Sequence, residues 1–467
     1  MTTLLRKALI AGLTACAVAG ATLVPAGASE TLPSRFDADL LAPDANGRAI
    51  IGFSHGIDAR TITRLADAGI TQAIRLDTID AVAVIGSVDA YRAISRWADV
   101  TYVDADSPLR LQNHIAKKDT KVTDVRRGAR PLKTKYNGKG VTVAVIDTGI
   151  ESVHQDLDNR VVKDLNFEGA YLFDMINDGL YSDQVAEATG SKVDSYGHGT
   201  HVAGIVAGTG EAADGKQNMS GVAPGAKLVN VKIADVHEGV DCTIPCDFGW
   251  EINALVAYEY VIEHRNQKIY GPHGIQIVTN SWSVFEVDSE VEPITLIVKA
   301  AAGKGLVNLF AAGNDGPDPN TVAKGPNSLE QVITVAAACK SADSCGKGKI
   351  ASFSSRGPQV DIAAPGHDIY SAVARASVLW PIGSHNPPGG PADTLDYVGF
   401  SGTSMATPHV AGIVALMLDA NPKLSYKQVE RILIRTAVDY GDRGFDTAFG
   451  HGFVNALRAV NAAEAAR

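Results

Sequence analysis

Basic residues and long apolar runs are both scarce in this chain of 467 residues. Lysine and arginine number 42 against 52 aspartates and glutamates, which gives a formal net charge of −10. A protein that binds nucleic acid usually presents a basic face to the phosphates, so this balance argues against that class. Beyond residue 24 no apolar stretch is long enough to cross a membrane. The sequence therefore predicts neither a nucleic-acid partner nor a membrane span.

Internal repeats and low-complexity tracts are also missing. What remains is a composition with 45% hydrophobic residues, 46 glycines and 20 prolines. These values are typical of a folded globular protein with many loops. The length is sufficient for a large enzyme domain and a second, smaller one.

Cysteine is rare as well, with five residues in the whole chain. Cys16 lies in the N-terminal segment, and the others are Cys242, Cys246, Cys339 and Cys345. Neither close pair has the two-residue spacing of a zinc knuckle, which argues against metal binding. Four cysteines allow three pairings, and closeness in sequence favours the disulfides Cys242–Cys246 and Cys339–Cys345. Such short loops should stiffen the chain locally rather than stabilise the whole fold.

The N-terminus has the pattern of a secretory signal. Arg6 and Lys7 precede an apolar stretch at 8–24, and the small residues Ala26-Gly27-Ala28 follow it. Residues 1–28 are therefore predicted to be a signal peptide that is removed on export. Lipid anchoring at Cys16, which ends a lipobox-like segment, is the alternative.

The first folded segment alternates short strands with amphipathic helices. Strands are predicted at 49–53, 71–76, 81–85 and 100–103, and helices at 59–68 and 90–98. This order is that of a small ferredoxin-like α+β unit. The flanking segments 29–48 and 107–137 are polar and mixed, and we predict a linker and an exposed joint there.

From residue 141 onward, continuous apolar strands alternate with helices. This pattern indicates a mostly parallel sheet that is covered on both faces, and so an α/β fold. Strands are predicted at 141–146, 227–232, 275–279, 306–311 and 332–338, and helices at 198–206, 250–264, 295–304, 404–418 and 425–436. Because ligands of such sheets bind at the carboxyl ends of the strands, the residues that follow strands are the candidates for chemistry.

Asp147 is the first such candidate, in Val145-Ile146-Asp147-Thr148-Gly149. A carboxylate at the end of a buried strand needs a partner. Aspartic proteases carry the same Asp-Thr-Gly tripeptide, but they need two, and no second Asp-Thr-Gly or Asp-Ser-Gly occurs here. A turn aspartate that caps a loop is the structural alternative.

His198 is the second candidate and opens a predicted helix between two glycines. Gly197 and Gly199 allow a close approach of the backbone and leave the imidazole accessible. His201, one turn later, points elsewhere and is predicted to be a packed core histidine. No acidic or cysteine ligand stands at zinc-protease spacing, which argues against a metal role for the two histidines.

Ser404 is the third candidate, at the start of the helix predicted at 404–418. In that position its own N–H faces a developing oxyanion, and the helix dipole favours negative charge there. An inert N-cap serine is the alternative, but it leaves the rest of the surrounding motif unexplained.

Together these segments resemble the catalytic blocks of the subtilisin family. The blocks are 143–150, His-Gly-Thr-His-Val-Ala-Gly at 198–204, and Gly-Thr-Ser-Met-Ala-Thr-Pro-His-Val-Ala-Gly at 402–412, in that family's order of Asp, His and Ser. The similarity runs from about residue 138 to the C-terminus and includes 311–314 and 351–355. It implies a three-layer α/β sandwich and a serine endopeptidase whose triad is Asp147, His198 and Ser404.

The resemblance assigns further roles around the triad. The side-chain amide of Asn314 is expected in the oxyanion hole, although Gly313 and Gly316 also suit a plain turn asparagine. The two walls of the main substrate pocket are expected from Ser281, Trp282 and Ser283 and from Ala311, Ala312 and Gly313. Because Trp282 and Ser283 depart from the family's usual aliphatic–glycine pair, the depth of this pocket stays open.

Two loops leave alternatives open. Segment 238–250 carries Glu238, Asp241 and Asp247, which either favour basic substrate residues or form a solvated acidic loop. Calcium is a common cofactor in the family, and Asp156 matches a position that often ligates it. The loop after Gly208, with Glu211, Asp214 and Asn218, differs from the family pattern, so no metal site is assigned. No cofactor is expected for the chemistry itself.

The resemblance also predicts how the chain divides. Residues 1–28 are the signal peptide, 29–115 the linker and a ferredoxin-like inhibitory prosegment, and 116–467 the catalytic domain. The expected partners are protein or peptide substrates and the chain's own prosegment. A monomer secreted by a bacterium is the expected form.

Two other classes of function were considered. An α/β-hydrolase esterase would use Ser404, Asp446 and His451, but only 63 residues follow Ser404, too few for the strands of that fold. A catalytically silent binding protein would lack a triad member, and none is lost here.

Overall fold

The structure is a computed structural model. The predicted signal peptide, Cys16, Cys242 and Cys246 lie outside the residues that it describes. The described residues are 33, 35–41, 47–105, 108–111, 119–168, 193–211, 219–236, 247–284, 293–322, 325–341, 345–346, 348–380 and 396–467. Within them no helix is long and apolar enough to cross a membrane.

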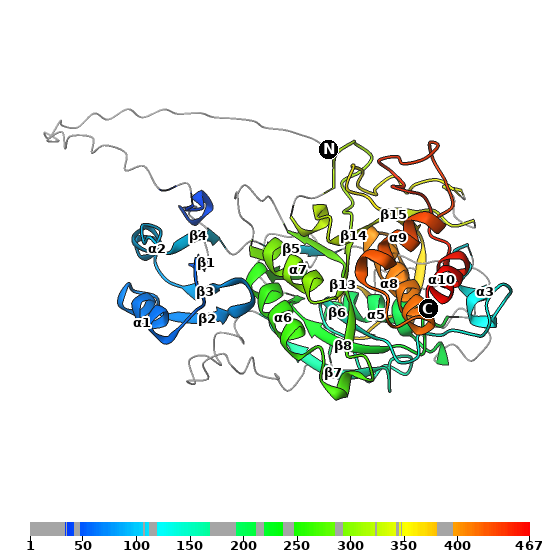
Figure 1. Ribbon diagram of the computed structural model, residues 1–467, viewed down its shortest axis with the longest axis horizontal. Helices are drawn as coiled ribbons and strands as arrows, with labels where there is room; N and C mark the ends of the chain where they lie inside the picture. Colours follow the sequence, from blue (N-terminus) through cyan, green and yellow to red (C-terminus); the bar gives the residue numbers. More distant parts are fainter. Residues whose placement is uncertain are drawn as a thin grey trace, which may run out of the picture.

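The N-terminal unit is a four-stranded antiparallel sheet with two helices, as predicted (Figure 1). Its strands lie in the order β2-β3-β1-β4, which is the ferredoxin-like arrangement. The elements are β1 (Arg48–Phe53), α1 (Ala59–Asp67), β2 (Gln72–Leu76), β3 (Ala81–Ile85), α2 (Val88–Ile94) and β4 (Val100–Ala105). A 3-10 turn, η2 (Asp77–Ile79), joins β2 to β3.

Both faces of this small sheet are buried. Ala49 and Ile51 on β1 pack in the unit's own core, whereas Ile50 between them packs with the apolar residues of a later part of the chain. Alternate side chains of a strand point to opposite faces, so a continuous apolar strand indicates burial on both sides. Gly52 makes room for the ring of Tyr102 on β4, because a Cβ at Gly52 would lie 2.2 Å from that ring.

The main domain is built on a seven-stranded sheet in which every neighbouring pair is parallel. The strand order is β15-β14-β13-β11-β6-β8-β7. The bounds are β6 (Thr142–Asp147), β7 (Val161–Asn166), β8 (Lys227–Lys232), β11 (Ile275–Asn280), β13 (Val307–Ala311), β14 (Val332–Ala338) and β15 (Ile362–Pro365). Strands β7 and β15, at the two edges of the sheet, were not predicted from the sequence.

Helices cover both faces of this sheet, which gives the predicted three layers (Figure 1). One face packs against α5 (His198–Ala207) and α8 (Thr403–Ala420), and the other against α6 (Glu251–His264) and α7 (Pro293–Gly303). Three more helices extend this layer: α10 (Ala456–Ala465) packs against α8, and α3 (Val122–Arg127) and α9 (Tyr426–Thr436) pack against α10. The N-terminal unit lies against the α6 and α7 side.

A second small sheet joins the two parts of the chain. Its strand order is β12-β5-β10-β9, and its strands are β5 (Pro108–Leu111), β9 (Ala234–Val236), β10 (Asp247–Trp250) and β12 (Trp282–Val284). The prediction of an exposed joint at 107–137 was therefore wrong in part. Strand β5 pairs on both sides, and Val122 and Val125 of α3 are buried. The sequence could not show this, because the strands that pair with β5 come from distant loops.

Candidate active site

Asp147 ends strand β6 at the carboxyl edge of the main sheet and is 1% exposed. Its Oδ1 accepts hydrogen bonds from the backbone N–H of Thr148 at 2.8 Å and from His198 Nδ1 at 2.6 Å. The position after a buried strand that marked Asp147 in the sequence thus brings its carboxylate to an imidazole. The costly buried charge has the partner that it needs.

His198 is the first residue of α5, and its imidazole is held at Nδ1 by Asp147. Gly197 has a φ of +99°, a conformation that favours glycine. A Cβ at Gly199 would lie 2.0 Å from the carbonyl oxygen of Gly149. The start of α5 therefore lies directly on the turn that follows Asp147, and the two glycines are what allows this approach.

Ser404 is the second residue of α8, and its hydroxyl is buried beside the loop before β12. The Oγ–H of Ser404 donates to the carbonyl oxygen of Ser281 at 2.9 Å, and the Oγ–H of Ser281 donates back to the carbonyl oxygen of Ser404 at 2.8 Å. The helix N-terminus places positive dipole charge at this serine. Ser281, predicted as a pocket wall, is thus in direct contact with the predicted nucleophile.

Asn314 lies beside the same helix N-terminus. Its Oδ1 accepts two hydrogen bonds from Thr403, one from the backbone N–H and one from the hydroxyl, each at 3.0 Å. Two donors on the carbonyl oxygen fix the amide, so its NH₂ faces away from Thr403. An amide oriented in this way next to Ser404 can donate to an oxyanion.

The predicted pocket walls differ in what their side chains do. The indole of Trp282 is 1% exposed, donates from Nε1 to the carbonyl oxygen of Ile146 at 3.1 Å, and packs edge-on against Phe310. This large side chain therefore fills the core beneath the wall. On the other wall Ala311 and Ala312 are buried, and Gly313 has a φ of +103°. Of the acidic loop, Glu238 and Asp241 lie outside the described residues.

The candidate calcium ligands have other partners or lie outside the part of the chain that the structure describes. No group of three or more histidine, cysteine, aspartate or glutamate side chains there could hold a metal ion. The Oδ2 of Asp156 accepts a hydrogen bond from the hydroxyl of Tyr397 at 2.6 Å. Glu211 is exposed, whereas Asp214 and Asn218 lie outside the described residues.

The remaining histidines and the esterase triad have other surroundings. His201 is fully buried, its Nε2 lies 3.1 Å from the carbonyl oxygen of Val398, and burial lowers the pKa of its imidazole to about 3. Asp446 accepts hydrogen bonds from the backbone N–H groups of its own loop. His451 packs edge-on against Phe445. These contacts give no support to an esterase built from Ser404, Asp446 and His451.

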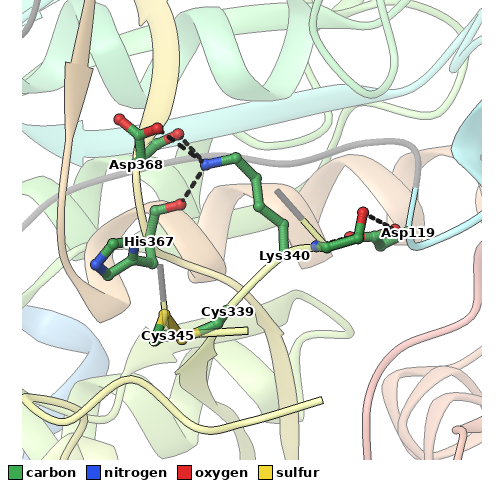
Figure 2. The surroundings of a disulfide bond; sticks show 7 residues. Asp119, Cys339, Lys340, Cys345, His367 and Asp368 are labelled. Atoms are coloured by element: carbon green, nitrogen blue, oxygen red, sulfur yellow. Dashed lines mark hydrogen bonds and ion pairs between the residues drawn. A yellow bond between two sulfur atoms is a disulfide. The ribbon is translucent and has the colours of Figure 1, made fainter. Parts of the chain in front are cut away.

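The disulfide predicted between Cys339 and Cys345 is present, with an S–S distance of 2.03 Å (Figure 2). Its loop also holds other parts of the chain. Lys340 Nζ donates to the carbonyl oxygen of His367 at 2.7 Å, and the backbone N–H of Ser341 donates to Asp119 at 2.6 Å. The disulfide therefore lies beside contacts between segments that are far apart in the sequence.

Three buried polar residues near the triad were not identified from the sequence. They are Thr148, Asp194 and Lys232, which are all at most 1% exposed. A lysine that ends an apolar strand, and an aspartate four residues before His198, are signals that could have marked two of them.

Comparison with known proteins agrees with this geometry. The family model described as the Subtilase family matches residues 138–452. Serine protease AprX of Bacillus subtilis is 34% identical over 340 residues, which cover 69% of this chain and 66% of that protein. Subtilisin E of the same species is 29% identical over 426 residues, covering 88% of this chain and 90% of that protein.

A solved structure shows the same fold. The crystal structure of fervidolysin from Fervidobacterium pennivorans, described as a keratinolytic enzyme related to subtilisin, aligns with a TM-score of 0.65 at 24% identity. The alignment covers 89% of this chain and 61% of that chain. With a family match over most of the main domain, this chain belongs to the subtilase family of serine proteases.

Proposed function

We propose that this protein is an exported serine endopeptidase that is made as a self-processing precursor. Ser404 is the nucleophile, His198 the general base and Asp147 the residue that orients His198. Residues 29 to about 115 are an inhibitory prosegment that the enzyme removes from itself. Proteins or peptides are the substrates, and no cofactor takes part in the bond cleavage.

In the proposed reaction the Oγ of Ser404 attacks a peptide carbonyl while His198 takes its proton. The resulting oxyanion receives hydrogen bonds from the Asn314 amide and the Ser404 N–H. His198 then protonates the leaving amine, and water releases the acyl group by the reverse sequence. The 2.6 Å hydrogen bond that His198 Nδ1–H donates to Asp147 supports this role, because with the proton on Nδ1 the neutral imidazole has an unprotonated Nε2 that can accept a proton.

One observation carries the prosegment proposal: the position of β5 beside the candidate nucleophile. Leu111 is opposite Trp282, Arg110 is opposite Ser283, and the two strands are antiparallel. Because β12 runs away from Ser281, β5 runs toward it, and Ser281 is hydrogen-bonded to Ser404. Strand β5 therefore has its C-terminal end, Leu111, on the side of Ser281 and Ser404, and pairs with β12 as the strand of a bound peptide substrate would.

The packing of the N-terminal unit supports the same proposal. The outer face of its sheet shares an apolar cluster with α6 and α7 of the main domain. The backbone N–H of Thr78 in η2 also donates to Glu259 on α6 at 2.9 Å. A unit docked in this way can keep β5 in its place until the chain is cut.

The test is to express the wild-type chain and the Ser404→Ala variant side by side and to measure both masses. The wild type should lose the residues up to about 115 and hydrolyse casein, whereas the variant should keep the prosegment and be inactive. A serine-directed phosphonate should label Ser404 and no other serine. Hydrolysis by the variant would disprove the nucleophile, and an active wild type that retains residues 29 to 115 would disprove the prosegment.

A further inference from the structure

We propose that Asp194 is a positioning residue that fixes Asp147 and His198 relative to each other, with Lys232 as its buried counter-charge. This inference rests on the triad proposed above. Asp194 lies in the loop before α5 and is 1% exposed. A carboxylate enclosed to this degree is strongly unfavourable unless it is well hydrogen-bonded, so its partners show what it holds.

On one side, Asp194 holds the helix that His198 opens. Its Oδ1 accepts the backbone N–H of Gly197 at 2.8 Å, and its Oδ2 accepts the backbone N–H and the hydroxyl of Thr200 at 2.8 and 2.7 Å. The N-cap residue Gly197 has no side chain with which to cap α5. Asp194 therefore caps the helix from outside, with one hydrogen bond from the residue before His198 and two from Thr200 after it.

On the other side, Asp194 reaches the turn that carries Asp147. The hydroxyl of Thr148 lies 3.0 Å from Asp194 Oδ1 and 3.3 Å from Asp147 Oδ1. This hydroxyl has a single hydrogen, and the shorter distance favours donation to Asp194. Thr148 Oγ1 also accepts the backbone N–H of Gly199 at 2.9 Å, so one side chain joins both catalytic segments.

Asp147 has little else to fix it. Within the described residues its Oδ2 has no hydrogen-bond partner, and its Oδ1 is held by His198 and Thr148. The orientation of the Asp147 carboxylate thus depends on the backbone and hydroxyl of Thr148. Asp194 in turn determines where that hydroxyl points.

Lys232 supplies the opposite charge behind the same turn. It is the last residue of β8, opposite Asp147 in the sheet register, and it is 1% exposed. Its Nζ donates to the carbonyl oxygen of Thr148 at 2.7 Å and pairs with Asp235 at 2.8 Å. The carboxylates of Asp147 and Asp194 and the ammonium of Lys232 are thus enclosed together around Thr148, and Asp235 pairs with Lys232 from a more exposed position.

Asp194 and Lys232 therefore contribute charge near His198 as well as fixing its geometry. Burial raises the pKa of the Asp194 carboxyl, while the N–H groups of Gly197 and Thr200 and the charge of Lys232 oppose the rise. Both Asp194 and Lys232 act on the imidazole of His198 through this enclosed space. The other titratable groups nearby are Glu151, His154, His201, Asp235, Arg375 and Asp396.

The pH dependence of kcat/KM separates positioning from simple structural support. Asp194→Asn removes a negative charge that favours the imidazolium and so lowers the pKa of His198. The acidic limb of the kcat/KM profile should therefore move to lower pH by about one unit. Lys232→Met removes a positive charge, so the same limb should move to higher pH. In both variants kcat should fall, by about 10²-fold for Asp194→Asn, with KM nearly unchanged, because neither side chain touches substrate.

The measurement uses the full-length chain and a fluorogenic peptide, with rates divided by the amount of Ser404 that a phosphonate labels. Misfolded molecules, which the phosphonate does not label, are then excluded from the enzyme concentration used to calculate kcat. Thr148→Val, which removes the bridging hydroxyl and keeps all charges, is a milder variant and should lower kcat with a smaller shift of the limb. The matched control is Asp361→Asn, which changes a half-buried carboxylate just before β15 and should leave the acidic limb in place.

Opposite shifts for Asp194→Asn and Lys232→Met support the proposal. No shift in either variant, or shifts in the same direction, would overturn it and leave Asp194 with a structural role only. A failure of the triad itself is distinguishable, since it would appear as activity in Ser404→Ala whatever the two variants do.

Discussion

Two buried carboxylates, Asp194 beside the triad and Glu259 beneath the N-terminal unit, are treated very differently by the fold. Asp194 accepts hydrogen bonds from Thr148, Gly197 and Thr200. Glu259 is 4% exposed and accepts the backbone N–H of Thr78 on Oε1, while within the described residues its Oε2 has no hydrogen-bond partner. The two carboxylates are buried to a similar degree, but only Asp194 has hydrogen-bond donors on both of its oxygens.

The difference corresponds to how long each group has to stay buried. The surroundings of Asp194 belong to one domain and persist through the life of the enzyme, and both of its carboxylate oxygens have hydrogen-bond donors there. Glu259 is covered by a unit that, in the proposed function, later departs. An interface that later separates gains little from hydrogen bonds to all of its polar groups, because water forms the missing hydrogen bonds once the two parts come apart.

The largest effect should follow from a substitution at Asn314, in the catalytic domain that remains after processing, and should appear in kcat. Asn314→Ala should lower kcat by roughly 10²–10³, with KM nearly unchanged, because the lost donor acts on the transition state. Steady-state kinetics on a fluorogenic peptide, normalised to labelled Ser404, measures this. Asp318→Ala, at an exposed position of the same connection, is the control and should behave as wild type. An unchanged kcat would remove Asn314 from the oxyanion hole.

Asp361 tests whether the number of hydrogen-bond donors to a carboxylate, rather than its burial, accounts for the difference between Asp194 and Glu259. It lies in the permanent domain but accepts one backbone N–H, from Thr334, and burial raises the pKa of its carboxyl to about 7. A carboxyl whose pKa is raised by folding favours the folded state at low pH, and that contribution is lost as pH rises from about 4 to about 7.

Asp361→Asn should therefore stabilise the protein at pH 8. The displaced pKa corresponds to about 4 kcal/mol at most, and partial exposure of the side chain reduces this to on the order of 2 kcal/mol. Urea unfolding of the inactive Ser404→Ala form, which cannot digest itself, measures the difference at pH 8 and pH 4. A gain of equal size at both pH values would contradict the titration of Asp361.

The smallest effect is expected at the separable face. Burial, with help from Glu263 and Asp77, raises the pKa of Glu259 to about 7, while the hydrogen bonds of Thr78 oppose the rise. Asp77 is itself paired with Arg75. Docking thus favours the protonated carboxyl and should weaken as pH rises from about 4.5 to about 7.

Glu259→Gln should make release of the prosegment slower at pH 8 by about tenfold and nearly independent of pH. The lag before activity appears in freshly processed enzyme, recorded from pH 5 to pH 8, measures this release. Glu263→Gln, on the exposed side of the same helix, should leave most of the pH dependence intact. A Glu259→Gln lag that varies with pH as in wild type would show that Glu259 does not control release.

Much of both folds was predictable because it depends on local patterns. Apolar strands such as β8 and β14 were predicted with their bounds, since a buried parallel strand reads as a continuous apolar run. Glycines around His198 marked the start of α5, because the close approach to Gly149 excludes a side chain. The short strands β5, β10 and β12 were missed, since their pairing depends on partners from distant parts of the chain.

By itself, the sequence determined which residue types stand at the ends of strands and helices, and thereby the candidates Asp147, His198, Ser404 and Asn314. Only the tertiary structure decided what surrounds them. It turned the indole of Trp282 into the core, brought β5 toward Ser404, and enclosed Asp194 with Lys232. The physical reason is that a backbone pattern is local, whereas hydrogen bonds and the desolvation of buried charge depend on groups that folding brings together from far along the chain.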